Sequence, residues 1–106
     1  MKILCVCQYG HSRSVALARV FHSMGHGAVS IGWATNGGAI ECLSDWADII
    51  ATLETQYARY VPIRSTAKIV DFNVGADRWV NPYHPELARI LTEKVNSLVA
   101  SGVIHQ

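Results

Sequence analysis

The chain has 106 residues, of which 50% are apolar and 16% charged, and its formal net charge is +1. This composition is typical of one globular domain spanning residues 1–106 and excludes a disordered chain. Acids and bases are scattered without a basic patch or polybasic tail, so we expect neither nucleic acid nor a membrane surface as a partner. The first apolar run is too short for a signal peptide and no run approaches membrane-spanning length, so we expect a cytoplasmic protein.

Apolar patterns along the chain predict alternating strands and helices. In chain order we expect a strand at 3–7, a helix at 14–24, a strand at 28–33, a helix at 40–47, a strand at 48–53, a helical segment at 55–61, a strand at 67–74 and a helix from about 84 to 102. This order predicts a three-layer α/β fold with a four-stranded parallel sheet and helices on both faces. Ligands bind beyond the carboxyl ends of the strands in such a sheet.

The loop after the first strand, CQYGHSRS, carries residues suited to binding and attacking a phosphoryl group. Backbone N–H groups between a strand and a helix N-terminus form a nest for a tetrahedral oxyanion, and the same field favours the nucleophilic thiolate of Cys7. Arg13 offers a planar fork of donors for two phosphoryl oxygens, Ser14 can donate a hydrogen bond to the sulfur, and Gly10 permits a tight bend. The expected phosphate-binding loop comprises Cys7, Gln8, Tyr9, Gly10, His11, Ser12 and Arg13.

With its Cys-x5-Arg spacing, this loop resembles the phosphate-binding loop of the low-molecular-weight protein tyrosine phosphatases, and the order of elements agrees over nearly the whole chain. The likeness is strongest to the short predicted branch of that superfamily, where a strand such as WADII precedes an acidic turn, here Leu53-Glu54. The resemblance implies a phosphomonoesterase, most simply a protein tyrosine phosphatase. In such an enzyme Cys7 takes the phosphoryl group, an aspartic acid protonates the leaving oxygen, and water hydrolyses the phosphocysteine.

The same resemblance implies the partners of the site. It implies no metal or organic cofactor, a phosphorylated protein or small aryl phosphate as substrate, and binding of phosphate, sulfate or vanadate. The chain departs from the family at Gly10, where members often have asparagine, and at Ser12, where many have a second cysteine. It also has Asn81-Pro82 in place of the usual Asp-Pro, and asparagine cannot donate a proton.

The general acid must therefore come from another residue. We predict Asp77, because it follows the fourth strand in a loop at the same sheet edge as Cys7. The alternatives are His84, which also suits the cap of the last helix, and Asp71, which suits a structural role within the strand.

Aromatic residues offer candidates for a substrate slot. Trp79 and Tyr83 either wall a slot for a flat aromatic substrate or pack their loop onto the core, and Tyr9 would form the other wall. We expect Cys5 and Cys42 to serve packing.

Other functions remain as alternatives. A phosphocysteine carrier similar to the IIB subunits of sugar phosphotransferase systems has a comparable layout, but the loops of such carriers generally lack the arginine. An arsenate-reductase-like redox enzyme needs resolving cysteines, for which only Cys5 and Cys42 are available. A phosphate-binding module without activity is the third alternative. Zinc is disfavoured, because Cys5, Cys7 and His11 lack a second ligand pair.

Overall fold

Four parallel strands form the central sheet of the computed structural model, which describes residues 1–76 and 78–105. They are β1 (Lys2–Cys7), β2 (Gly27–Gly32), β3 (Ile49–Thr52) and β4 (Ile69–Asp71). The order across the sheet is β2-β1-β3-β4, and each neighbouring pair is parallel. β1 has a partner strand on each side, which explains why its residues from Ile3 to Cys7 are all apolar and buried. The predicted parallel sheet is confirmed.

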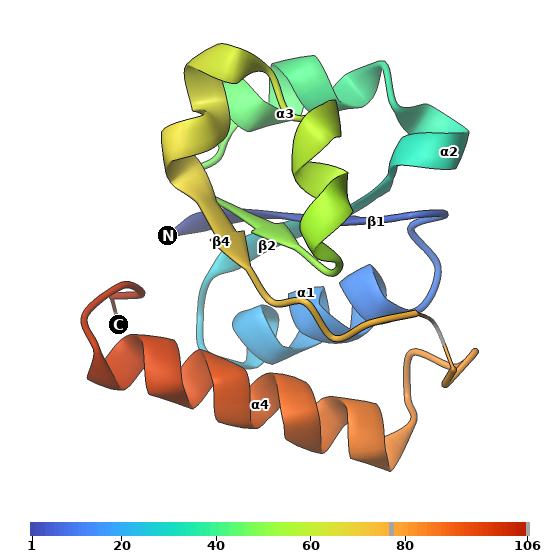
Figure 1. Cartoon of the computed structure of the whole chain (residues 1–106). Coiled ribbons are helices and arrows are strands. Elements are labelled where there is room, and N and C mark those ends of the chain that lie inside the picture. Colours follow the sequence, from blue (N-terminus) through green and yellow to red (C-terminus); the bar gives the residue numbers. More distant parts are fainter. Residues whose placement is uncertain (77, 106) are drawn as a thin grey trace.

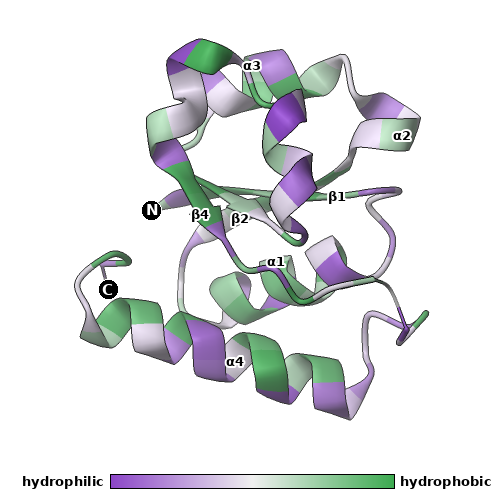
Figure 2. Ribbon diagram, viewed as in Figure 1, coloured by the Kyte–Doolittle hydropathy of each residue, from purple (hydrophilic) through white to green (hydrophobic). Residues whose placement is uncertain are grey.

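Helices cover both faces of this sheet, as Figure 1 shows. One face carries α1 (Arg13–Ser23) and α4 (Pro85–Ala100), and the other carries α2 (Trp33–Asn36), α3 (Ala39–Trp46) and two 3-10 helices, η1 (Thr55–Tyr60) and η2 (Ile63–Lys68). Hydrophobic and hydrophilic residues alternate along α4 (Figure 2), and Leu87, Leu91 and Val95 form its buried stripe. In the described part of the chain, no helix is long and apolar enough to cross a membrane.

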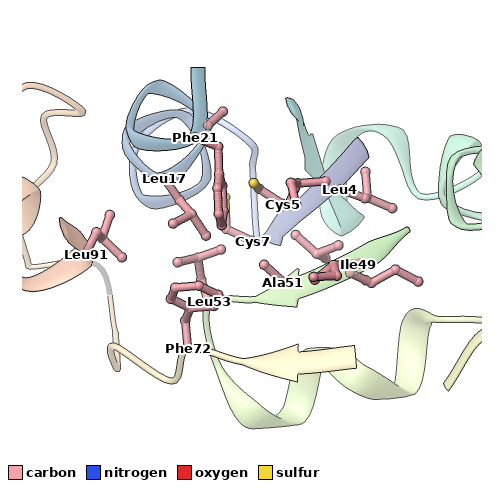
Figure 3. Packing of buried hydrophobic residues seen from close by; sticks show 14 of the residues in the cluster. Leu4, Cys5, Cys7, Leu17, Phe21, Ile49, Ala51, Leu53, Phe72 and Leu91 are labelled. Carbon is pink, nitrogen blue, oxygen red and sulfur yellow. The ribbon is translucent and has the colours of Figure 1, made fainter. Parts of the chain in front are cut away.

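Packing of α1 on the sheet fixes the loop between β1 and α1. Figure 3 shows Leu17 and Phe21 of α1 pointing toward Leu53 and Phe72, which follow β3 and β4. The rings of Phe21 and Phe72 meet edge to face with centroids 6.3 Å apart, and both are almost fully buried. Truncation of such a phenylalanine to alanine costs about 3–5 kcal/mol. Both ends of the loop at residues 8–12 are therefore attached to firmly packed elements.

The structure differs from the predicted elements in the middle of the chain. The helical segment expected at 55–61 is the 3-10 helix η1, and the strand expected at 67–74 is limited to the three residues of β4. The residues before β4 form η2 instead of extending the strand, and Asn73 has a φ of 39°, which takes the chain out of the extended conformation. Backbone hydrogen bonds still attach residues 72–74 to the end of β3.

Candidate active site

The sulfur of Cys7 lies at the carboxyl end of β1 and is surrounded by hydrogen-bonding groups. It accepts a hydrogen bond from the backbone N–H of Gly10 at 3.1 Å and lies 2.9 Å from the hydroxyl of Ser14. Gly10 has a φ of 75°, the left-handed conformation that turns its N–H back toward the sulfur. Cys7 itself is only 2% exposed. Both groups can donate a hydrogen bond to the sulfur.

Ser30, on β2, extends this network and was not predicted from the sequence. Its hydroxyl lies 2.6 Å from the hydroxyl of Ser14 and 3.2 Å from the carbonyl oxygen of Gly10. Each serine hydroxyl has one proton to donate. When Cys7 is a thiolate, Ser14 donates to the sulfur and accepts from Ser30; when Cys7 is a thiol, Ser14 and Ser30 can donate in the opposite direction, toward Gly10. The two hydroxyls can therefore adapt to either protonation state of the sulfur without moving.

Arg13, the first residue of α1, is held by three partners from the other side of the site. Its Nη1 donates to Glu54 Oε2 and to the carbonyl oxygen of Gly75, both at 2.6 Å, and its Nη2 donates to the hydroxyl of Tyr57 at 3.1 Å. Tyr57 in turn donates to the same carboxylate oxygen of Glu54. Arg13 is 3% exposed, and its Nε is buried without a hydrogen-bond partner in the part of the chain that the structure describes. The guanidinium is thus fixed in orientation, and among the described residues its Nε–H and one Nη2 N–H have no hydrogen-bond acceptor.

These contacts decide which groups are charged. Burial lowers the pKa of Arg13, but hydrogen bonds with Glu54 and Tyr57 outweigh burial and leave its pKa raised. Burial raises the pKa of Glu54, but hydrogen bonds from Tyr57, Arg13 and Gln56 outweigh it and leave its pKa lowered. Burial and the hydrogen bond to Glu54 raise the pKa of Tyr57. At neutral pH the site contains a cation and a carboxylate in contact, so Glu54 is unsuited to donating a proton.

A pocket of about 530 Å³ opens at this position. Its lining combines the loop residues Cys7, Gln8, Tyr9, His11, Ser12 and Arg13 with Glu54, Ala76 and Val80. The lining contains every predicted phosphate-binding residue except Gly10, whose N–H donates to the Cys7 sulfur beneath the pocket. Gly10 contacts β2 instead, where an added Cβ would lie 2.8 Å from the nitrogen of Gly32.

The residues predicted for the substrate slot lie in different places. Tyr9 is 52% exposed and lines the pocket. Trp79 does not line it and is buried, with Arg78 over its ring. Tyr83 does not line it either, and Arg19 lies over its exposed ring at 4.2 Å. Of the two alternatives for Trp79, the structure favours packing, and of the three aromatic residues Tyr9 is the one that lines the pocket.

The candidate acids also differ in placement. Asp77 lies outside the described residues. Asp71 accepts hydrogen bonds from the hydroxyls of Thr52 and Thr55, a structural role at the end of β4. His84 is the N-cap of α4 and accepts a hydrogen bond from the backbone N–H of Glu86 at 3.2 Å.

The other two cysteines lie apart from the pocket lining. Cys5 is fully buried among core side chains (Figure 3), and burial raises the pKa of its thiol, with a smaller contribution from Cys7. The expectation that Cys42 serves packing is wrong, because it lies on the exposed side of α3. Among the described residues, no group of three or more His, Cys, Asp or Glu side chains is placed to hold a metal ion.

Comparison with known proteins identifies the fold. The sequence matches no protein-family model and no curated protein. The structure is similar to the tyrosine phosphatase Wzb from Escherichia coli K30 in complex with phosphate, with a TM-score of 0.71, 10% identity, and coverage of 94% of this chain and 96% of that chain. It is similar to the YwlE arginine phosphatase from Geobacillus stearothermophilus, with a TM-score of 0.65, 14% identity and 99% coverage of both chains. For a low molecular weight protein tyrosine phosphatase from Bacillus subtilis, the TM-score is 0.64 at 14% identity, covering 96% of this chain and 99% of that chain. The chain therefore has the fold of the low-molecular-weight protein tyrosine phosphatases, as its first loop predicted.

Proposed function

We propose that the protein is a cysteine-dependent phosphomonoesterase that acts through a phosphocysteine intermediate, with phosphotyrosine or another aryl phosphate as substrate. The observation that carries this proposal is the pairing of Cys7 and Arg13 in one pocket. The sulfur is held by Gly10 and Ser14, and the guanidinium has a buried Nε–H that meets no acceptor among the described residues. A charged N–H donor in the same pocket as a nucleophilic sulfur suits a negatively charged phosphoryl group better than a neutral ligand.

The reaction begins with attack of the Cys7 thiolate on phosphorus. The S–P bond forms as the bond from phosphorus to the leaving oxygen breaks, and Asp77, our proposed general acid, gives its proton to that oxygen. The support for Asp77 is its place in the chain directly after Ala76, which lines the pocket. Arg13 Nε–H and the loop N–H groups donate to the equatorial phosphoryl oxygens as charge builds on them.

The second step hydrolyses the phosphocysteine. Water attacks phosphorus and gives its proton to the Asp77 carboxylate, the S–P bond breaks, and inorganic phosphate leaves. Ser14 again donates a hydrogen bond to the departing thiolate, while its own oxygen accepts a hydrogen bond from the Ser30 hydroxyl. A fixed cation at the phosphoryl group stabilises the transition state of hydrolysis, which supports an enzyme over a carrier that must preserve its phosphocysteine.

Steady-state hydrolysis of p-nitrophenyl phosphate tests the proposal. We expect Cys7→Ser to abolish turnover and Arg13→Ala to lower kcat about 10³-fold or more, because it removes the fixed cation from the transition state. The matched control is Cys42→Ser, which replaces an exposed cysteine on α3 and should retain wild-type rates. Wild-type turnover in Cys7→Ser would contradict the proposal, and a phosphocysteine that persists and is passed to a sugar or protein would favour the carrier.

The general acid has its own test. We expect Asp77→Asn to lower kcat on phosphotyrosine about 10²-fold or more, and to have a much smaller effect on a substrate whose leaving group needs no proton. Phosphoarginine and phosphotyrosine are compared in the same assay, because the similar structures include an arginine and a tyrosine phosphatase. A variant His84→Gln that loses activity while Asp77→Asn keeps it would reassign the acid.

A further inference from the structure

Val80 has a backbone conformation that its side chain disfavours. Its φ is 60°, and among the described residues only one other non-glycine residue, Asn73, has a positive φ. Asparagine occupies this left-handed region with little strain, whereas a β-branched side chain clashes with its own backbone there. Glycine or asparagine at position 80 would make the protein more stable, so the backbone conformation does not explain why valine occupies this position.

Packing of the core does not account for it. Val80 is 81% exposed, so its side chain gains little from burial. It is held between two fixed points: Trp79, which is 5% exposed, and the turn at Asn81, whose side-chain oxygen accepts a hydrogen bond from the backbone N–H of Tyr83 at 2.9 Å. The strained residue is thus presented to solvent by an ordered segment.

The solvent that Val80 faces is the pocket above Cys7. The pocket is polar at depth, where Cys7 and Arg13 are 2% and 3% exposed, and it has large exposed hydrophobic side chains at its mouth, where Tyr9 and Val80 are 52% and 81% exposed. Tyr9 comes from the loop after β1 and Val80 from the segment before α4, so the mouth has one such side chain from each of two separate segments. A ligand that matches this layout has an anionic group at one end and a flat apolar group at the other.

We propose that Val80 is a specificity-determining residue that, together with Tyr9, contacts the leaving group of the substrate and selects aryl over alkyl phosphates. This rests on the proposed function and extends it by naming the residue that reads the substrate outside the phosphoryl group. Neither Trp79 nor Tyr83 is needed for that contact. An apolar leaving group covers the exposed surface of Val80 when it binds, and the site therefore gains affinity for aryl esters.

Calorimetric titration with benzylphosphonate and methylphosphonate tests this proposal without relying on turnover. We expect the ratio of the two affinities to fall about tenfold in Val80→Asn and in Val80→Gly, because each removes apolar surface from the mouth. Both residues suit a positive φ, so we also expect the midpoint of thermal unfolding to rise. The matched control is Asn73→Gly, at the other left-handed residue and outside the pocket lining, which should leave the ratio unchanged.

The outcomes separate this inference from the proposed function. If both phosphonates bind in an Arg13-dependent manner and the ratio is the same in wild type and both Val80 variants, the inference is overturned and the proposed function stands. A rise in thermal midpoint with an unchanged ratio would likewise assign Val80 a purely structural effect. If neither phosphonate binds the wild-type protein, both proposals fail together.

Discussion

Arg13 is both the cation of the site and a buried charge that the fold must stabilise. Its three terminal hydrogen bonds all point to Glu54, Tyr57 and Gly75, and the side chain of Glu54 is 16% exposed. Glu54 holds the guanidinium but also brings a negative charge close to where a phosphate would bind. Glu54 therefore orients the guanidinium of Arg13, but its negative charge weakens the electrostatic attraction between the site and a bound phosphate.

Replacing Glu54 tests this balance. We expect Glu54→Gln to lower the free energy of unfolding by about 2 kcal/mol at pH 7, because a buried cation loses its carboxylate partner. The folded-state pKa of Glu54 is depressed, so its contribution is present above its unfolded pKa and is lost as pH falls through the folded value. The difference in free energy of unfolding between the wild type and Glu54→Gln should therefore become smaller below about pH 4. Urea denaturation at pH 7 and pH 3 measures both quantities.

The control for that measurement is Asp45→Asn, which breaks an exposed ion pair between Asp45 of α3 and Arg64 of η2. Solvent screens that pair, so little change in the urea midpoint is expected. If the difference in free energy of unfolding between the wild type and Glu54→Gln is the same at pH 7 and pH 3, the carboxylate does not stabilise the fold through its charge.

Only the local part of this site could be predicted from the sequence. Cys7, Arg13 and Ser14 lie within eight consecutive residues, and their spacing, together with the apolar strand before them and the amphipathic helix after them, indicates a phosphate-binding loop. Their partners are distant: Ser30 is 16 residues from Ser14, and Glu54 is 41 residues from Arg13. The sequence contains a weak signal for each partner: Ser30 is a polar residue within an otherwise apolar strand, and Glu54 is an acid directly after one. Neither pattern indicates which distant side chain the residue contacts.

At the scale of the elements, the loop after β1 lies directly against β2. A Cβ on Gly10 would lie 2.8 Å from the nitrogen of Gly32, and a Cβ on Gly32 would lie 2.2 Å from the carbonyl carbon of Tyr9. These distances are below any ordinary contact, so the two backbones approach only because neither residue has a side chain. The glycine that departs from the family pattern is thus matched by a second glycine on the neighbouring strand.

We therefore expect that Gly10→Asn, which restores the usual family residue, damages this protein. Asparagine tolerates the left-handed φ of Gly10, but its Cβ has no room, and we expect the free energy of unfolding to fall by about 2 kcal/mol. The control is Gly25→Asn, where φ is 87° and nothing lies within 4 Å of an added Cβ. Denaturant midpoints compare the two, and equal midpoints would mean that the loop can move away from β2 without cost.

The elements themselves were predictable where their pattern is long and regular. The apolar run of β1 and the amphipathic α1 and α4 were found at almost their observed bounds. The segment at 55–74 was not, because two 3-10 helices bury few residues and leave no periodic pattern, and β4 is only three residues long. Such short elements are determined by tertiary contacts rather than by local sequence.

At the scale of the whole molecule, the strand order assembles the site. Because β1 is central and all four strands are parallel, the carboxyl ends of β1, β2 and β3 meet at one edge. That edge receives Cys7 from β1, Ser30 from β2, Glu54 from the turn after β3 and Gly75 from the segment after β4. A ligand that engages Cys7 and Arg13 is therefore linked, through the hydrogen bonds of these two residues and of Ser14, to residues within or after all four strands.

Anion binding should consequently stabilise the entire fold. A ligand that binds only the native state adds about 2.7 kcal/mol at one hundred times its Kd. For a chain of 106 residues this corresponds to a rise of about 10 °C in Tm. We expect inorganic phosphate at that concentration to produce this rise in the wild-type protein, measured by calorimetry against chloride at equal ionic strength. In Arg13→Ala the rise should disappear, because the buried guanidinium that lines the pocket is gone. A phosphate-dependent rise of the same size in Arg13→Ala would place the stabilising anion elsewhere on the molecule and separate the fold's stability from the pocket above Cys7.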